Sequence, residues 1–477
     1  MSRSRKLCAI LLVCVLCMVV GCGKQTTETT QEKKAVTYDN GMDNWKSEVK
    51  AKELTCWYTN EDDKTFLENA AKGFQDTYGI QVNLVYYDGV SLFEDMNQAN
   101  QKTQGPDVYI MGNDQLEYAV SGGMAEENTT FDEAFWQKEY PETAKKALTY
   151  KNKQYGYPVY FDTYCLVYDA NLLENAPASI DDILAFLDEY EDTGSTKAVF
   201  RWDVADPYVN TMFLASYANL FGENGDESGS IEVNNEQCVA AMQYFQSLSA
   251  YLWMDKSNIS HDTVMNRIKD GTLVLGLCKS DILPTLYEMQ GQQNTEAADE
   301  NQTDATKEET AQDTEGQNEN VQENDNQEQT DATQDDGNAT GDSKESKDST
   351  NYQIAYVPSL TAELSSTTLS TTYGAFVNPY ANDTAAGNLF AFYLSYACSD
   401  QQYAGNGKLP VRNLGDGFDA MQSVLYAQYL NSKPVPKVMV LGDYLVDSGI
   451  AFDAIWDGQD AAEQLNWLQT TLEEKIK

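Results

Sequence analysis

Histidine is almost absent from this chain of 477 residues, and His261 is the only one. A zinc site built on two histidines is therefore excluded, and a hydrolytic triad would have to use this one residue. The sequence also lacks the GxSxG, HExxH and Walker motifs. Basic residues are scarce, 32 against 75 acidic ones, whereas nucleic-acid binding needs basic side chains that neutralise phosphates. We therefore expect no nucleic-acid partner, no cofactor and no metal.

The acidic residues are unevenly distributed along the chain. Residues 292–350 contain 18 Asp or Glu and 3 Lys, a net charge of −15, which leaves −28 of the total of −43 on the other 418 residues. Val321 is the only aliphatic residue in this segment larger than alanine, so the segment cannot bury enough apolar surface to offset the entropy of ordering it. We therefore expect 292–350 to be a disordered acidic insert. It could be an inert spacer, a solubilising brush, or a bait for a basic or divalent-cation partner.

Residues 1–22 have the features of an export signal. A positively charged region at residues 3–6 precedes an apolar run at 7–20, which is short for a membrane-spanning helix. The following Val19-Val20-Gly21-Cys22 resembles the lipobox of bacterial lipoproteins, although an ordinary signal peptide could also contain a cysteine. We expect 1–21 to be a lipoprotein signal peptide, Cys22 to be the lipidation site and 22–50 to be a lipid-anchored flexible tether. The protein would then sit on the extracytoplasmic face of the cell membrane.

Five cysteines remain beyond residue 50. They form no CxxC pair, their number is odd, and they lie among apolar neighbours. This pattern favours small buried hydrophobic side chains over a complete disulfide framework. The five are Cys56, Cys165, Cys238, Cys278 and Cys398.

The mature chain begins with alternating strands and helices. Strands are expected at Leu54–Tyr58, Gln81–Tyr87 and around 105–111, with helices around 66–74 and 92–102 between them. This alternation indicates an α/β fold with a mainly parallel sheet, in which ligands bind beyond the carboxyl ends of the strands. The rule selects residues 59–61 and 112–114.

The pattern continues after residue 150. A β-prone stretch at 153–168 is interrupted by the polar Asp162, and helices are expected around 180–190, 208–221 and 236–251. Further strands are expected at 272–278 and 352–358. Residues 224–231 resemble the start of a calcium loop, but Asn235 stands where such a loop has glutamate, which favours a hairpin turn.

A series of short segments in a fixed order resembles the extracellular solute-binding proteins of ABC importers, the group that includes the maltose/maltodextrin-binding proteins. The segments are Leu54–Tyr58, Phe74–Val82, Gly105–Val108, Gly156–Val159, Leu166–Asp169 and Gly374–Val377. The resemblance implies two α/β lobes joined by hinge crossings near 161–163, 373–376 and 409–413, with a ligand cleft between them. The N-terminal lobe would be 51–161 and 378–412, and the C-terminal lobe 162–377 and 413–477, with the insert 292–350 inside it.

The resemblance also implies a function. The chain would be a monomeric, lipid-anchored receptor that captures a mono- or oligosaccharide by lobe closure and delivers it to the membrane permease of an ABC importer. It would not be an enzyme, and only its lipid anchor would touch the membrane. Two alternatives stay open: a binding protein for a cationic solute such as a polyamine or amino sugar, and a secreted carbohydrate-active enzyme.

Ligand residues follow from the resemblance position by position. Carboxylates and aromatic rings suit sugars, which present hydroxyl groups and one C–H-rich face. The tryptophans of the family correspond here to Met111, Asp281 and Leu445, so Tyr160 and Tyr444 are candidates for replacement rings. The expected set is Glu61, Asp62, Asp114, Asp162, Asp206, Tyr208, Asp281, Tyr160 and Tyr444.

Simpler interpretations exist for several of these residues. Asp62 or its neighbour Asp63 could cap a helix, and Asp114 could cap the helix expected to begin at residue 115. Tyr208 could belong to the core. His261, between two polar neighbours, is expected to be an exposed loop or capping residue.

Overall fold

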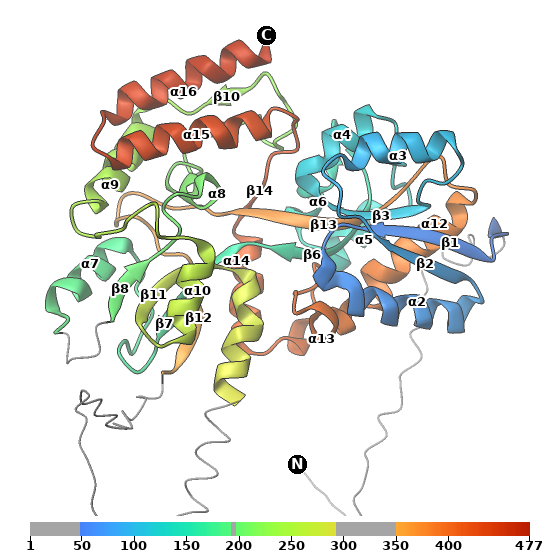
Figure 1. The fold of residues 1–477 in the computed structure, drawn as a ribbon, viewed down its shortest axis with the longest axis horizontal. Helices are drawn as coiled ribbons and strands as arrows, with labels where there is room; N and C mark the ends of the chain where they lie inside the picture. Colours follow the sequence, from blue (N-terminus) through green and yellow to red (C-terminus); the bar gives the residue numbers. More distant parts are fainter. Residues whose placement is uncertain (1–47, 192–196, 292–349) are drawn as a thin grey trace, which may run out of the picture. The chain divides into compact units, whose positions relative to one another are not determined.

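The computed structural model describes residues 48–191, 197–291 and 350–477 (Figure 1). The expected signal peptide, nearly all of the tether, and the insert up to residue 349 lie outside the described residues. Within the described part of the chain, no helix is both long enough and apolar enough to cross a membrane.

The first sheet combines parallel and antiparallel strands. Its order is β14 (Lys433–Pro434), β13 (Leu369–Val377), β3 (Val108–Gly112), β1 (Glu53–Tyr58) and β2 (Gln81–Tyr86), and β6 (Tyr157–Asp162) also pairs with β13. β1 is parallel to β2 and β3, as expected for strands joined by helices. β13 is antiparallel to β3 and β6 and parallel to β14. The sheet is therefore mixed: the predicted parallel pairing holds for β1 with β2 and β3 and for β13 with β14, and it is wrong where β13 pairs with β3 and β6.

Helices cover this sheet, and the spacing of their apolar residues explains why they form. In α2 (Lys64–Tyr78), Phe66, Leu67, Ala70 and Phe74 are buried on one face, and Gly79 ends the helix with a φ of 69°. The other elements of this lobe are α3 (Leu92–Gln101), α4 (Leu116–Ser121), α5 (Glu133–Glu139), α6 (Glu142–Ala147), β4 (Thr149–Tyr150), β5 (Lys153–Gln154), α12 (Thr384–Phe392) and α13 (Gln402–Asn406).

The second sheet has four strands in the order β12 (Tyr352–Ala355), β7 (Tyr164–Asp169), β11 (Leu273–Lys279) and β8 (Ala198–Arg201). β7 is antiparallel to both of its neighbours, and β8 is parallel to β11. The surrounding elements are α7 (Ile180–Glu189), α8 (Pro207–Asn210), β9 (Asn219–Leu220), β10 (Ile231–Glu232), α9 (Glu236–Leu248), α10 (His261–Lys269), a helix at 283–291, α14 (Ala420–Leu430), α15 (Leu441–Trp456) and α16 (Ala461–Ile476).

The chain passes from the first sheet to the second within one residue. β6 ends at Asp162 and β7 begins at Tyr164, so only Thr163 lies between the two strands. β13 also connects the two halves, as Figure 1 shows. Its residues 371–377 pair with β6 and β3 of the first sheet, although the expected lobe boundary assigns them to the second lobe. These residues of β13 therefore belong structurally to the first sheet, because their hydrogen-bonded neighbours are β3 and β6.

Three local predictions have clear outcomes. The helix expected at 208–221 is wrong: α8 ends at Asn210, a 3-10 turn follows at Thr211–Phe213, and Phe221 adopts a φ of 64°. The segment is buried on nearly all sides, so the spacing of its apolar residues does not indicate a helix with one buried face. The hairpin preferred over a calcium loop is confirmed, since β9 and β10 pair antiparallel. The five cysteines are free and buried, as predicted.

Candidate ligand-binding site

Asp162 lies at the crossing between the sheets and is held by two side chains. One carboxylate oxygen accepts hydrogen bonds from Lys408 Nζ at 3.0 Å and from Ser280 Oγ at 2.8 Å. Lys408 follows α13 and its side chain is 9% exposed. Burial lowers the pKa of Lys408, but the negative charges, chiefly Asp162 and Asp281, outweigh it and raise the pKa. Sequence reasoning missed Lys408 because its partner is 246 residues away.

Tyr208 stands beside three carboxylates. Asp206 caps α8 by accepting a hydrogen bond from the Tyr208 backbone N–H at 2.9 Å. The Tyr208 hydroxyl lies 3.0 Å from Thr371 Oγ1 of β13. Burial raises the pKa of Tyr208, and the charges of Asp114, Asp162 and Asp206 raise it further. The structure therefore brings these four predicted residues close together from three elements, namely the turn after β3, the end of β6 and the start of α8.

Asp114 follows β3, at the strand end that the sheet rule selects. The 3-10 turn Asn113–Gln115 holds it there, because the Asn113 side chain donates to Val435 O and accepts from the Thr372 N–H. Gln115 Nε2 donates a hydrogen bond to the Asp114 carboxylate at 2.9 Å. Burial raises the pKa of this carboxyl although its hydrogen bonds lower it.

Asp281 pairs with the single histidine. Its Oδ1 lies 3.1 Å from Nε2 of His261, and the charges of His261, Lys408 and Lys279 lower the pKa of Asp281 against the effect of burial. His261 is the first residue of α10, and Ser260 is the N-cap. The expectation of an exposed loop or capping side chain is therefore wrong: the ring is 17% exposed and faces Asp281.

Two predicted rings are not available to a ligand. Tyr444 is fully buried in the core of the second lobe, and its hydroxyl lies 3.0 Å from Thr211 Oγ1. Tyr160 is 1% exposed and stacks on Tyr373, with ring centroids 4.5 Å apart. Both predictions rested on position in the chain alone, and burial overturns them. Tyr373, which sequence reasoning missed, lies two residues after Thr371 on β13 and is partly exposed.

The loop after β1 has three acidic residues, of which two are exposed and one is buried. Glu61 and Asp62 are exposed in the 3-10 turn Glu61–Asp63, and the turn is capped by Asn60, which accepts from the Asp62 N–H. Asp63 precedes α2 but makes no side-chain cap to it. Its buried carboxylate instead accepts from Tyr160 and Asn406, at 2.9 and 2.8 Å. Asp62 contributes to the raised pKa of Lys408, which connects this loop to the cluster around Asp162.

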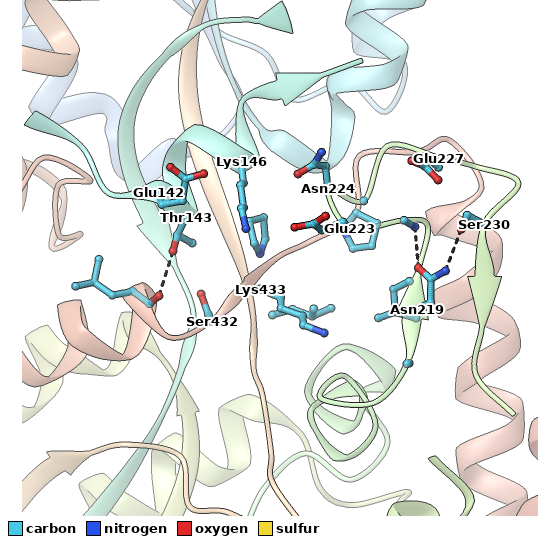
Figure 2. Close-up of a pocket in the computed structure, with 18 residues that line it drawn as sticks. Glu142, Thr143, Lys146, Asn219, Glu223, Asn224, Glu227, Ser230, Ser432 and Lys433 are labelled. Carbon is cyan, nitrogen blue, oxygen red and sulfur yellow. Dashed lines mark hydrogen bonds between the residues drawn. The ribbon is translucent and has the colours of Figure 1, made fainter. Parts of the chain in front are cut away.

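A cavity of about 690 Å³ lies beside β14, and we call it the β14 cavity. Residues of α6, the β9–β10 hairpin and β14 line it, and Figure 2 shows Lys146, Glu223 and Lys433 among them. None of the predicted ligand residues lines the cavity.

Comparison with known sequences gives consistent relatives. The chain is 27% identical over 246 residues to a maltooligosaccharide ABC transporter solute-binding lipoprotein of Streptococcus pneumoniae, covering 50% of this chain and 52% of the relative. It is 24% identical over 219 residues to the maltodextrin-binding protein MdxE of Bacillus subtilis, covering 44% and 51%. The chain thus spans about half the length of the curated relatives it matches.

Solved structures show the same fold. A cyclo/maltodextrin-binding protein complexed with maltotetraose superposes with a TM-score of 0.68 and 18% identity, covering 90% of this chain and 99% of that one. An extracellular solute-binding protein from Staphylococcus aureus in complex with maltose gives a TM-score of 0.68 with 16% identity, covering 90% and 98%. The predicted two-lobed α/β fold is confirmed. The family model described as "Bacterial extracellular solute-binding protein" matches residues 69–335, and the chain belongs to this family.

Proposed function

We propose that the protein captures a neutral carbohydrate between its two lobes and delivers it to an ABC importer. The observation that carries this proposal is the arrangement around Tyr208, where one partly exposed ring stands beside the carboxylates of Asp114, Asp162 and Asp206. Carboxylate oxygens accept hydrogen bonds from sugar hydroxyls, and an aromatic face packs against the C–H side of a sugar ring. The names of the relatives above, which bind maltooligosaccharides and maltodextrin, support the same class of ligand.

The proposed site takes residues from both halves of the fold. Asp62 and Asp114 come from the first lobe, Asp206, Tyr208 and Asp281 from the second, and Asp162 from the crossing. Glu61 is proposed as an outer contact because it is exposed in the same loop as Asp62. The lobes are proposed to be 51–161 with 378–412, and 162–377 with 413–477, except that β13 completes the first sheet. A ligand that touches both lobes favours the closed state, which the permease would recognise.

The proposal extends to the location of the protein. The lipobox-like sequence ending at Cys22 supports cleavage before this residue and anchoring of a monomeric receptor through its lipid. Metabolic labelling with a radioactive fatty acid checks the anchor directly. The wild type should carry the label and lack residues 1–21, whereas Cys22→Ser should carry no label and keep the signal segment. Labelling of the variant, or a wild type without label, would contradict this part of the proposal.

Titration calorimetry against glucose, maltose, maltotetraose, galactose and spermidine tests the ligand class. We expect at least one neutral sugar to bind with a dissociation constant in the micromolar range. Binding of spermidine without a response to any sugar would overturn the proposal in favour of a cationic solute. The geometry argues against that alternative, because the ammonium of Lys408 and the ring of His261 already face Asp162 and Asp281.

A carbohydrate-active enzyme is the competing class. The family consists of binding proteins, and the carboxylate of Asp162 is held by Lys408 and Ser280 rather than left as a free acid or base. Incubating the protein with maltotetraose for a day and separating the products by chromatography checks this alternative. We expect unchanged maltotetraose, and a hydrolysis product at a level above the buffer control would contradict the binding proposal.

A further inference from the structure

The ammonium of Lys408 lies among several carboxylates. It contacts Asp162 directly at 3.0 Å, and the charges of Asp281 and Asp62 also act on it. Asp63 accepts a hydrogen bond from Asn406, which lies two residues before Lys408. The charge of Lys408 also lowers the pKa of Asp63. The ammonium thus contacts one carboxylate and acts electrostatically on three others, and the four come from three segments of the chain.

The neighbouring basic side chains are engaged elsewhere. His261 pairs with Asp281 at 3.1 Å. Lys279 stands over the ring of Tyr164 with its Nζ 6.0 Å from the centroid, and its charge acts on Asp281 and Asp203. Asp162 itself receives Lys408 and the neutral Ser280 hydroxyl. The charge balance at Asp162 therefore depends on Lys408.

Lys408 is fixed in this position by its surroundings. Its backbone N–H donates to Asn406 Oδ1 at 3.0 Å, which closes a tight turn after α13. Two residues further, Pro410 forms an isolated bridge with Tyr160 of β6. The side chain is 9% exposed, so its ammonium cannot leave Asp162 for water unless the turn after α13 moves. A lysine held in this way presents a permanent positive charge to whatever enters the cluster.

We propose that Lys408 is a specificity-determining residue that excludes cationic solutes from the ligand site by occupying Asp162 with an ammonium from the protein itself. This inference rests on the carbohydrate-binding function proposed above. A polyamine or amino sugar would have to place a second ammonium beside the first, and like charges at such distances repel. A neutral sugar does not meet this repulsion. It can also accept a hydrogen bond from the ammonium while donating its hydroxyls to the carboxylates.

The test compares Lys408→Met with the wild type by titration calorimetry. The probes are glucose with glucosamine, which differ by one ammonium, and maltose with spermidine. We expect the preference for the cation over the neutral sugar to rise about tenfold or more in the variant, because Asp162 loses its resident counter-charge. A purely structural role would weaken all four probes equally and leave the ratio unchanged.

Two further variants serve as controls. Lys408→Arg keeps the charge and should keep the exclusion. Lys197→Met removes a lysine with 12% exposure from its ion pair with the buried Asp169, and should leave the ratio unaltered. If Lys408→Met fails to show a cooperative thermal transition, Lys408→Gln replaces it.

The outcomes separate the two proposals. An unchanged ratio in Lys408→Met, or tight spermidine binding by the wild type, overturns the role of Lys408. If no sugar binds the wild type, the carbohydrate function fails. The gain or absence of spermidine binding in the variant still decides whether Lys408 excludes cations.

Discussion

The ring of Tyr160 stacks on the ring of Tyr373, with 4.5 Å between the centroids and 17° between the planes. One face of Tyr373 is therefore covered by the protein, and only its other face can meet a ligand. The second partly exposed ring at the site is Tyr208, whose hydroxyl contacts Thr371 on the same strand as Tyr373. Tyr373 and Tyr208 are therefore the two rings that we propose to stack against a short saccharide.

This arrangement predicts how affinity depends on the length of the sugar. If one or two sugar rings fill the stacking surface, maltose and maltotetraose should bind with dissociation constants within about threefold of each other. Titration calorimetry with maltose, maltotriose and maltotetraose measures the series. A gain of about tenfold with each added ring would show that further stacking surfaces exist.

Removal of the Tyr208 ring should weaken sugar binding. Tyr208→Ala is expected to raise the dissociation constant about tenfold or more, since stacking contributes on the order of 1 kcal/mol beyond the area that it buries. Tyr208→Phe keeps the ring and loses only the contact with Thr371, so its affinity should lie near that of the wild type. Tyr444→Phe, in the core, is the matched control. An unaltered dissociation constant in Tyr208→Ala would remove this residue from the site.

Asp63 should make stability depend on pH. Burial raises the pKa of its carboxyl from 3.8 to about 6, against the lowering effect of hydrogen bonds from Asn406 and Tyr160. Protonation therefore favours the folded state, so this contribution is fully present below about pH 4 and is lost as the pH rises through about 6. The two-unit difference corresponds to a free energy on the order of 3 kcal/mol.

Urea unfolding of the wild type and Asp63→Asn at pH 4 and pH 7.5 checks this expectation. The stability of the variant relative to the wild type should rise between the two pH values, because asparagine carries no charge to bury. The exposed Asp416→Asn is the control and should show no such change. A difference between wild type and Asp63→Asn that is the same at both pH values would contradict the prediction.

The acidic segment should be dispensable for ligand binding. Gln290 Nε2 lies 3.5 Å from Tyr352 O, so the described residues on either side of the segment are close together. Replacing 292–350 by a short Gly-Ser linker should leave the dissociation constant for sugar unchanged, as measured by calorimetry. A large loss of affinity in a variant that still unfolds cooperatively would show that the segment takes part in binding.

Local patterns in the sequence predicted much of the fold. The spacing of Phe66, Ala70 and Phe74 gave α2, and the polar Asp162 inside an apolar stretch marked the break between β6 and β7. The pattern failed where burial is nearly complete, as at 208–221, because a segment that is apolar on all sides shows no period. It also did not predict the strand β13, whose antiparallel pairing with β3 and β6 is set by contacts between distant parts of the chain.

The site was predicted less well than the fold for the same reason. Asp114 follows from the position of a strand end, whereas Asp206 and Tyr208 were implied by the family resemblance alone. Lys408 and Tyr373 have no local signature, because each is brought to Asp162 or Tyr208 by long-range packing. Tyr444 was predicted as a ligand residue from its position in the chain, but its side chain is buried in the core.

The five buried cysteines have a practical consequence. Burial raises the pKa of every one of these thiols, to about 11 for Cys238 and about 12 for Cys398 and further for the others, so little reactive thiolate is present at neutral pH. In a recombinant chain that starts after Cys22, a cysteine introduced at the exposed Val90 or Trp253 would be the one thiol that reacts readily with a maleimide dye. A fluorescent reporter of the proposed lobe closure could therefore be attached to this protein without replacing any native cysteine.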